Sequence, residues 1–300
     1  MEFYSHGKLL LTAEYAVLEG VKALAVPTKR GQFLRVEHTT EGTIKWQSFT
    51  VEGKLWIDCI FDLKLNCLSS REGSSSVIEQ LSVILKTLNR LSPNFFADGI
   101  ALSTQLEFPL DWGLGSSSTL INNLAQWVGI NPYLLLEETM GGSGYDIAAA
   151  QSETALFYRR NKFSPTIEAV LFSPPFKDKL FFVYLKEKQN SREAIAGFNE
   201  RNALNSTSKK RLEEIGTLLI NTKKQSNFNA LLKEHEDITA SFLGQISVQE
   251  RLFPDFKGQL KSLGAWGGDF ILASGDETTV NYFRQNGYPT IFRYADFILG

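Results

Sequence analysis

One stretch of the sequence, residues 108–127, constrains fold and function more than any other: FPLDWGLGSSSTLINNLAQW. Gly113 and Gly115 precede three serines and Thr119, and an apolar run with helical spacing follows. Glycine lets a backbone approach a ligand closely and adopt a positive φ. The helix that follows directs free N–H groups and the positive end of its dipole at the turn. This order predicts an anion site, for which phosphate is the usual ligand.

A second interpretation of the same stretch needs no ligand. Serine is a favoured residue at helix N-termini, and glycine is common in tight turns. Residues 108–127 could therefore be a serine-capped helix that begins after a glycine turn. The local sequence leaves both interpretations open.

The overall charge limits the kind of partner that this chain can attract. The 300 residues carry a formal net charge of −2, with 43% hydrophobic and 21% charged residues. Such a composition is typical of a globular protein with a substantial core, built as one large domain or two ordinary ones. A charge near zero provides no general field for nucleic acid or an anionic membrane. We expect a small-molecule ligand, no nucleic-acid partner and no membrane partner, so local groups must hold any anion.

The cysteines and the N-terminal residues indicate a compartment. Cys59 and Cys67 are the two cysteines of the chain, and that usage fits reducing conditions better than a disulfide. The first residues show no basic segment ahead of an apolar core, and no apolar run reaches the roughly 20 residues of a membrane span. We therefore expect a cytoplasmic protein.

The order of hydrophobic patterns predicts an α+β fold rather than a βαβ repeat. A Pro174–Pro175 break divides the chain into expected domains at 1–173 and 174–300. In the first domain we expect strands at 2–5, 9–12, 33–38, 43–49, 54–60, 99–107 and 163–172, a loop at 69–76, and helices at 77–91, 120–128 and 133–139. In the second we expect strands at 179–187, 270–274 and 290–294, and helices at 192–201, 209–223, 228–243, 252–263 and 278–286.

Three single residues have both an ordinary and a functional interpretation. Lys8 resembles a surface lysine when taken alone, but it follows Gly7 and precedes an apolar strand. Asp146 follows a glycine-rich loop and precedes an apolar run, so it is either a helix N-cap or a functional carboxylate. His235 lies between charged residues on an expected helix, which favours a solvated or structural histidine.

Four motifs in a fixed order give the sequence a family resemblance. They are HGKLLLTAEYAVLEG at 6–20, PLDWGLGSSST at 109–119, GSGYDIAAA at 142–150 and LGAWGGDF at 263–270. Together they resemble the GHMP kinase superfamily of small-molecule kinases over essentially the whole chain. Within it, AEYAVLEG and GSGYDIAAA are most similar to the mevalonate-pathway branch, and closer to phosphomevalonate kinases than to mevalonate kinases. Ala13 and Trp266 stand where the family has glycine.

The resemblance implies a two-domain fold and a set of site residues. The N-terminal ATP-binding domain would be α/β and similar to domain 2 of ribosomal protein S5, and the C-terminal domain a ferredoxin-like α+β sandwich. Asp146 would be the catalytic base and Lys8 its neighbour, and Ser117 and Glu138, with Glu137 as a competitor, would bind magnesium. ATP would be bound by Gly113, Leu114, Gly115, Ser116, Ser117, Ser118 and Thr119. Substrate would be bound by Glu14, Gly142, Ser143, Gly144, Gly267 and Gly268.

The implied activity is ATP- and magnesium-dependent phosphorylation of a mevalonate-type acceptor, with phosphomevalonate favoured and mevalonate as the alternative. A phosphorylated acceptor would require further cations, for which the sequence offers Lys29, Arg30, Arg159 and Arg160. Ala13 and Trp266 favour a different hypothesis, a non-catalytic nucleotide-binding homologue. A decarboxylase on the same fold is a third hypothesis. The sequence leaves the oligomeric state open between monomer and homodimer.

Overall fold

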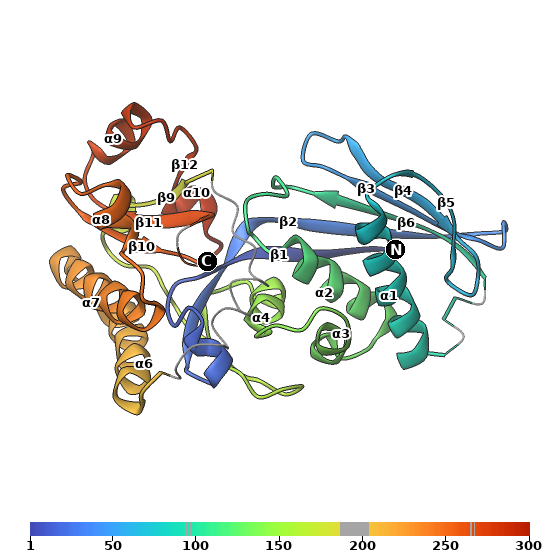
Figure 1. The fold of residues 1–300 in the computed structure, drawn as a ribbon, viewed down its shortest axis with the longest axis horizontal. Helices are drawn as coiled ribbons and strands as arrows, with labels where there is room; N and C mark the ends of the chain where they lie inside the picture. Colours follow the sequence, from blue (N-terminus) through green and yellow to red (C-terminus); the bar gives the residue numbers. More distant parts are fainter. Residues whose placement is uncertain (94, 97, 187–203, 265, 267) are drawn as a thin grey trace. The chain divides into compact units, whose positions relative to one another are not determined.

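The computed structural model describes residues 1–93, 95–96, 98–186, 204–264, 266 and 268–300, which form a mixed α+β structure (Figure 1). They group into two compact units made of several chain segments each. Unit 1 contains residues 1–7, 30–110 and 115–151, and unit 2 contains residues 8–29, 111–114 and 152–300. The domains expected at 1–173 and 174–300 are contiguous, whereas residues 8–29 and 111–114 group here with the C-terminal part of the chain. The expected domain division stays a prediction.

Unit 1 is a mixed sheet with helices on one face. In spatial order its strands are β5 (Cys67–Glu72), β4 (Leu55–Phe61), β3 (Ile44–Phe49), β6 (Gly99–Leu106) and the second half of β2 (Ala23–Thr39). β3 and β6 are parallel, and the other neighbours are antiparallel. The helices are α1 (Ser75–Leu91), α2 (Ser116–Val128), α3 (Pro132–Thr139) and α4 (Tyr145–Gln151), and α1, α2 and α3 follow one face of the sheet in Figure 1.

Hydrophobic periodicity explains this arrangement. Buried side chains alternate with partly buried or exposed ones along β3 and β4, which gives the sheet one apolar face. In α1 the buried residues Ile78, Leu81, Leu85 and Leu88 recur at helical spacing and form one apolar stripe. Trp46 and Phe61 of the sheet join this stripe and the buried face of α2 in a single core.

Unit 2 contains an antiparallel sheet in the order β10 (Gln259–Ser262), β11 (Phe270–Ser274), β9 (Leu180–Tyr184) and β12 (Ile291–Arg293). Its helices are α6 (Ser206–Asn221), α7 (Gln225–Leu243), α8 (Val248–Leu252), α9 (Thr279–Gln285) and α10 (Tyr294–Phe297). Short 3-10 helices occur at η1 (Ala16–Glu19) and η2 (Lys177–Lys179). Strands β7 (Leu156–Arg159) and β8 (Thr166–Ala169) continue from the first half of β2. Strand β1 (Glu2–Leu10) starts in unit 1 and ends in unit 2, whereas β2 starts in unit 2 and ends in unit 1.

The antiparallel sheet is buried on both faces. Phe181 and Val183 of β9 pack into an apolar cluster with Phe283 of α9. Phe182, which points to the opposite face, contacts Phe297 of α10. On β10, Leu260 belongs to the first cluster, and Lys261 therefore points to the other face, where α7 packs. This alternation places a lysine inside the protein.

Several predicted elements were wrong. The helix expected at 252–263 ends at Leu252, and the chain then forms β10, since Pro254 and Gly258 interrupt the helix. Part of the loop expected at 69–76 is β5, an edge strand whose six residues are all exposed, so it carries no apolar alternation. The two strands expected at 2–5 and 9–12 are the single strand β1. The helix expected at 192–201 lies outside the described residues.

Candidate functional site

The approach to the predicted phosphate loop, residues 111–114, is fixed by aromatic packing inside unit 2. The indole of Trp112 lies at the edges of the rings of Phe270 and Phe292, with centroid distances of 5.6 and 5.3 Å. Next to it, the Tyr184 hydroxyl donates a 2.8 Å hydrogen bond to Oδ2 of Asp111. Burial and this carboxylate raise the pKa of Tyr184 above its ordinary value, so the phenol keeps its proton and the bond.

Three of the four sequence motifs meet within unit 2. Gly113 has a φ of 63°, and a Cβ on it would lie 1.9 Å from Oδ2 of Asp269, so only glycine fits there. Asp269 belongs to the motif at 263–270. The backbone N–H of Lys8, from the first motif, donates a 3.0 Å hydrogen bond to the carbonyl of Leu114. Residues more than 100 positions apart thus set the shape of the loop.

The serines of the same motif begin helix α2 in unit 1. Gly115 is the N-cap residue with a φ of 89°, and no side chain of the described residues caps the helix there. The first helical hydrogen bond runs from Thr119 N–H to the carbonyl of Gly115 at 2.9 Å. The N–H groups of Ser116, Ser117 and Ser118 therefore precede the helical ladder, and Ser117 is exposed. This geometry fits the predicted anion site better than a serine-capped helix.

Buried polar side chains hold α2 in unit 1. Ser5 of β1 donates to Asn123 at 2.7 Å and accepts from Asn122 at 2.8 Å. Thr119 donates to the side chain of Gln32 at 2.6 Å. Ser118 and Thr119 are buried, so they support the helix start, and Ser117 is the hydroxyl that reaches solvent. Sequence reasoning missed the two asparagines, because Asn in a helix is usually a surface residue.

Asp146 lies in the first turn of α4, which packs against α2 in unit 1. The N–H groups of Ile147 and Ala148 both donate to the carbonyl of Gly144, whose φ is 85°. The helix therefore begins at Gly144, and the N-cap interpretation of Asp146 was wrong. Gly142 also has a positive φ, of 110°, and Ser143 is buried. A carboxylate in a first turn is stabilised by the helix dipole.

The predicted magnesium carboxylates lie on α3. Glu138 forms an ion pair with Arg90 of α1, which a metal ligand would have to give up. Glu137 beside it is exposed. Among the described residues, no three His, Cys, Asp or Glu side chains are grouped as a metal site. Because Mg²⁺ usually combines one or two carboxylates with phosphate oxygens and water, the exposed Ser117 hydroxyl and one carboxylate would fit it.

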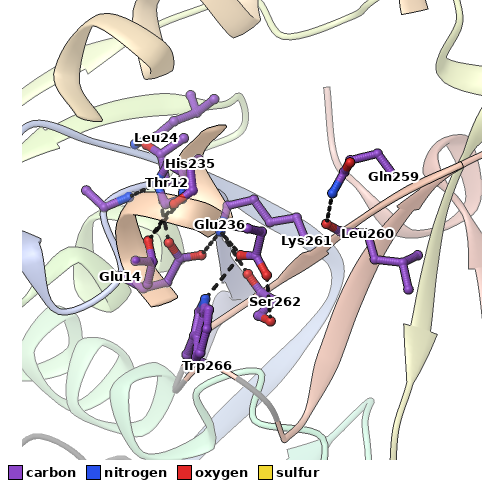
Figure 2. Close-up of polar contacts among 12 residues, drawn as sticks. Thr12, Glu14, Leu24, His235, Glu236, Gln259, Leu260, Lys261, Ser262 and Trp266 are labelled. Carbon is purple, nitrogen blue, oxygen red and sulfur yellow. Dashed lines mark hydrogen bonds and ion pairs between the residues drawn. The ribbon is translucent and has the colours of Figure 1, made fainter. Parts of the chain in front are cut away.

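Glu14, a predicted substrate-binding residue, is fully buried. Its Oε1 accepts a hydrogen bond of 2.6 Å from Nζ of Lys261, which is also fully buried (Figure 2). Burial raises the pKa of the Glu14 carboxyl to about 7, although Lys261 opposes the shift. Its side chain could contact a substrate only if this cluster opened. Of the remaining predicted substrate residues, Gly268 is buried and Gly267 lies outside the described residues.

The basic candidates for a phosphorylated acceptor all have protein partners. Lys29 donates to the carbonyl of Ala295, and Arg30 to that of Glu107. Arg159 forms an ion pair with Glu213, and Arg160 donates to the carbonyl of Leu18. Each therefore has a structural role in addition to any ligand contact.

A hollow of about 440 Å³ lies in unit 1 against strands β2 to β6. Charged side chains such as Arg35, Lys45 and Arg71 line it. It contains no residue of the four motifs, so we do not assign it to the candidate site.

Sequence reasoning missed Lys261 and Glu236. Lys261 was placed on an expected helix, and Glu236 follows a histidine in a charged helical segment. Neither carries a local signal of burial. Cys59 is a buried thiol and Cys67 an exposed one. No described helix is long and apolar enough to cross a membrane.

The fold formed by these elements is shared with solved structures of mevalonate kinase, phosphomevalonate kinase and galactokinase. The chain is similar to Methanococcus jannaschii mevalonate kinase, at 15% identity and a TM-score of 0.69, with 97% of this chain and 96% of that one covered. It is also similar to Streptococcus pneumoniae phosphomevalonate kinase in complex with phosphomevalonate and AMPPNP, at 16% identity, a TM-score of 0.68 and coverages of 99% and 96%.

Lactococcus lactis galactokinase in complex with galactose gives 13% identity, a TM-score of 0.69 and coverages of 99% and 92%. No protein-family model and no curated sequence matches this chain. At these identities the similarity establishes the fold, and the reaction has to be argued from the residues.

Proposed function

We propose that the protein is an ATP- and magnesium-dependent kinase that phosphorylates a mevalonate-type acceptor, with phosphomevalonate favoured and mevalonate as the alternative. The observation that carries this proposal is the start of α2. Left-handed glycines lead into a helix that has no side-chain cap among the described residues, and Ser117 is exposed in its first turn. A triphosphate is the ligand that such a start suits best.

The protein residues supply positioning and charge, which is most of what phosphoryl transfer requires. The N–H groups of Ser116, Ser117 and Ser118 bind phosphate oxygens, and the dipole of α2 adds positive potential. The Ser117 hydroxyl is a magnesium ligand, and Glu138 is the candidate carboxylate once it leaves Arg90. When bound, magnesium neutralises charge on the phosphates.

Asp146 has a role that depends on the acceptor. For a hydroxyl acceptor such as mevalonate, Asp146 accepts the proton of the attacking oxygen. A phosphate oxygen, with a second pKa of about 6, is largely ionised at pH 7 and needs orientation more than deprotonation. Lys8 is assigned as the cationic neighbour of Asp146. This assignment of Lys8 and Asp146 rests on the motif resemblance.

The direct test is ADP release, coupled to a spectrophotometric reaction, with phosphomevalonate, mevalonate, galactose and homoserine as acceptors. We expect the highest kcat/KM with phosphomevalonate and no turnover without magnesium. Binding of AMPPNP is measured in parallel by calorimetry. Nucleotide binding without turnover of any acceptor would favour the non-catalytic homologue, and absence of nucleotide binding would refute both. Cytoplasmic location stays a prediction.

A further inference from the structure

Three residues in the first and last motifs have a positive φ, which normally requires glycine: Ala13, Tyr15 (φ 61°) and Trp266. Ala13 has a φ of 63° and Trp266 a φ of 51°, both in the left-handed region. A side chain there is strained, because Cβ lies too close to the carbonyl oxygen that follows. Such strain persists only where the surroundings enforce the conformation. The structure therefore has to contain groups that hold Ala13 and Trp266 in place.

Two consecutive residues of α7 provide these groups. The N–H of Ala13 donates a 2.8 Å hydrogen bond to Nε2 of His235, which is fully buried. Nε2 is therefore unprotonated, and the ring proton is on Nδ1, 3.3 Å from the Thr239 hydroxyl. Burial and the nearby Lys261 lower the pKa of His235 well below its ordinary value, in agreement with a neutral ring.

Glu236 holds the second strained residue. The Trp266 indole N–H donates a 3.1 Å hydrogen bond to Oε1 of Glu236 (Figure 2). The indole ring packs against Leu243. Oε2 of Glu236 accepts from the Ser262 hydroxyl at 3.0 Å. Both oxygens of this buried carboxylate thus bind residues of the segment that leads to the last motif. Hydrogen bonds to a charged acceptor are stronger than those to a neutral one.

Lys261 joins the two anchor points. Its ammonium lies 2.6 Å from Glu14, the residue after Ala13, and 3.4 Å from Glu236. It also donates to the carbonyl of Ser262 at 2.9 Å. The turn after β1, helix α7 and strand β10 are therefore connected by three ionisable side chains that are almost completely excluded from water.

The anchored segments continue directly to the predicted phosphate loop. Three residues after Trp266, the carbonyl of Asp269 accepts from the N–H of Leu185, and its carboxylate lies against Gly113. Six residues before Glu14, the backbone of Lys8 binds Leu114. A change at Trp266 or Ala13 would therefore alter the backbone contacts that residues 113–114 make with Asp269 and Lys8.

We propose that His235 and Glu236 are positioning residues, which hold the first and last motifs in a preformed conformation and thereby raise the affinity of the phosphate loop for nucleoside triphosphates. The proposal rests on the proposed nucleotide site. Preformed loops bind more tightly because less conformational freedom is lost on binding. Ala13 and Trp266 stand where the family has glycine. In this proposal, two residues held rigidly by α7 replace glycines whose backbone would be more flexible.

The test compares variants that alter the anchor with one that alters its neighbour. Trp266→Phe keeps an aromatic ring at the same strained φ and removes the N–H donor together with part of the buried ring. Glu236→Gln removes the charge of the acceptor. Glu234→Gln, two residues earlier on α7, makes the same chemical change at an exposed ion pair with Arg211 and is the matched control. AMPPNP affinity is measured by calorimetry at a temperature where every variant is folded.

We expect Trp266→Phe and Glu236→Gln to bind AMPPNP about fivefold to tenfold more weakly, which corresponds to roughly 1–1.4 kcal/mol. Hydrogen exchange should rise in peptides containing Ala13 or Trp266, and Glu234→Gln should change neither property. Trp266→Gly tests whether an anchored backbone or a flexible one binds AMPPNP more tightly. It relieves the strained φ but removes the anchor, so we expect weaker binding.

The outcomes distinguish this inference from the function on which it rests. Wild-type protein that binds no AMPPNP would refute the nucleotide site, and the inference with it. If wild-type protein binds and the anchor variants lose thermal stability but keep its affinity, the anchor is structural only and the inference alone fails. Tighter binding by Trp266→Gly would also overturn it, because flexibility would then be the favourable property.

Discussion

Replacing Lys261 with methionine tests whether the buried charge cluster is built around its single ammonium. Methionine keeps most of the side-chain length and apolar volume and removes the positive charge. In the native protein that charge contacts Glu14 at 2.6 Å and Glu236 at 3.4 Å, and Lys261 and Glu14 are completely buried. Without it, two carboxylates would remain in the interior with no cation.

The expected loss follows from burial. Removal of one partner from a buried ion pair costs about 3–5 kcal/mol, because the remaining charge is uncompensated. In domains of 150–250 residues each kcal/mol lowers Tm by about 2–4 °C, so we expect Lys261→Met to lower Tm by about 6–20 °C. Lys233→Met is the matched control. Lys233 pairs with Asp237 on the exposed side of α7, where such pairs contribute about 0–1 kcal/mol.

The raised pKa of Glu14 predicts how the loss of stability in Lys261→Met changes with pH. The pKa of Glu14 is raised from 4.5 to about 7, so the folded protein holds a proton that the unfolded chain releases between these values. The stability that this bound proton adds to the folded protein is fully present below pH 4.5 and is lost as the pH rises through 7. A shift of one pKa unit corresponds to about 1.36 kcal/mol, so the proton contributes about 3 kcal/mol. Removal of Lys261 leaves the carboxylates harder to ionise. The Tm difference between wild type and Lys261→Met should therefore be larger at pH 8 than at pH 5.5.

Thermal unfolding followed by circular dichroism from pH 5.5 to 8.5 measures both effects. The triple variant Lys261→Met, Glu14→Gln, Glu236→Gln has no charge in the cluster and should recover most of the lost Tm at pH 8. The reasoning is refuted if Lys261→Met destabilises no more than Lys233→Met does. It is also refuted if the triple variant is no more stable than the single one.

Three further predictions concern the proposed reaction. Gly113→Ala should weaken AMPPNP binding at least tenfold by calorimetry, because its Cβ would meet Asp269; Gly129→Ala, with a φ of 75° and open space around it, carries the same strain without the clash and should bind normally. Asp146→Asn should lower kcat with a hydroxyl acceptor by about 10²–10⁴-fold while AMPPNP still binds; turnover within a few-fold of wild type would exclude a base role. Ser117→Ala should raise the magnesium concentration needed for half-maximal ADP release several-fold, and an unchanged magnesium titration would count against Ser117 as a ligand.

Local patterns were sufficient for much of the fold and for part of the site. The glycine–serine order at 113–119 predicted a left-handed turn followed by a helix, and Gly113, Gly115 and α2 have that geometry. Helix α1 was predicted from the spacing of its apolar residues, because burial of one helical face leaves a periodic signal. Asp146 was correctly placed at the start of a helix, although Gly144 takes the cap position.

The sequence by itself determined the left-handed glycine turn at 113–115 and the type of most elements, because these depend on neighbours within a few positions. Only the tertiary structure decided which charges are buried. Lys261 looks like a surface lysine in the sequence, and it is internal because Glu14 and Glu236 meet it from 247 and 25 positions away. The desolvation of such a charge is offset only by partners at hydrogen-bonding distance, and no local pattern specifies partners so far apart in the chain.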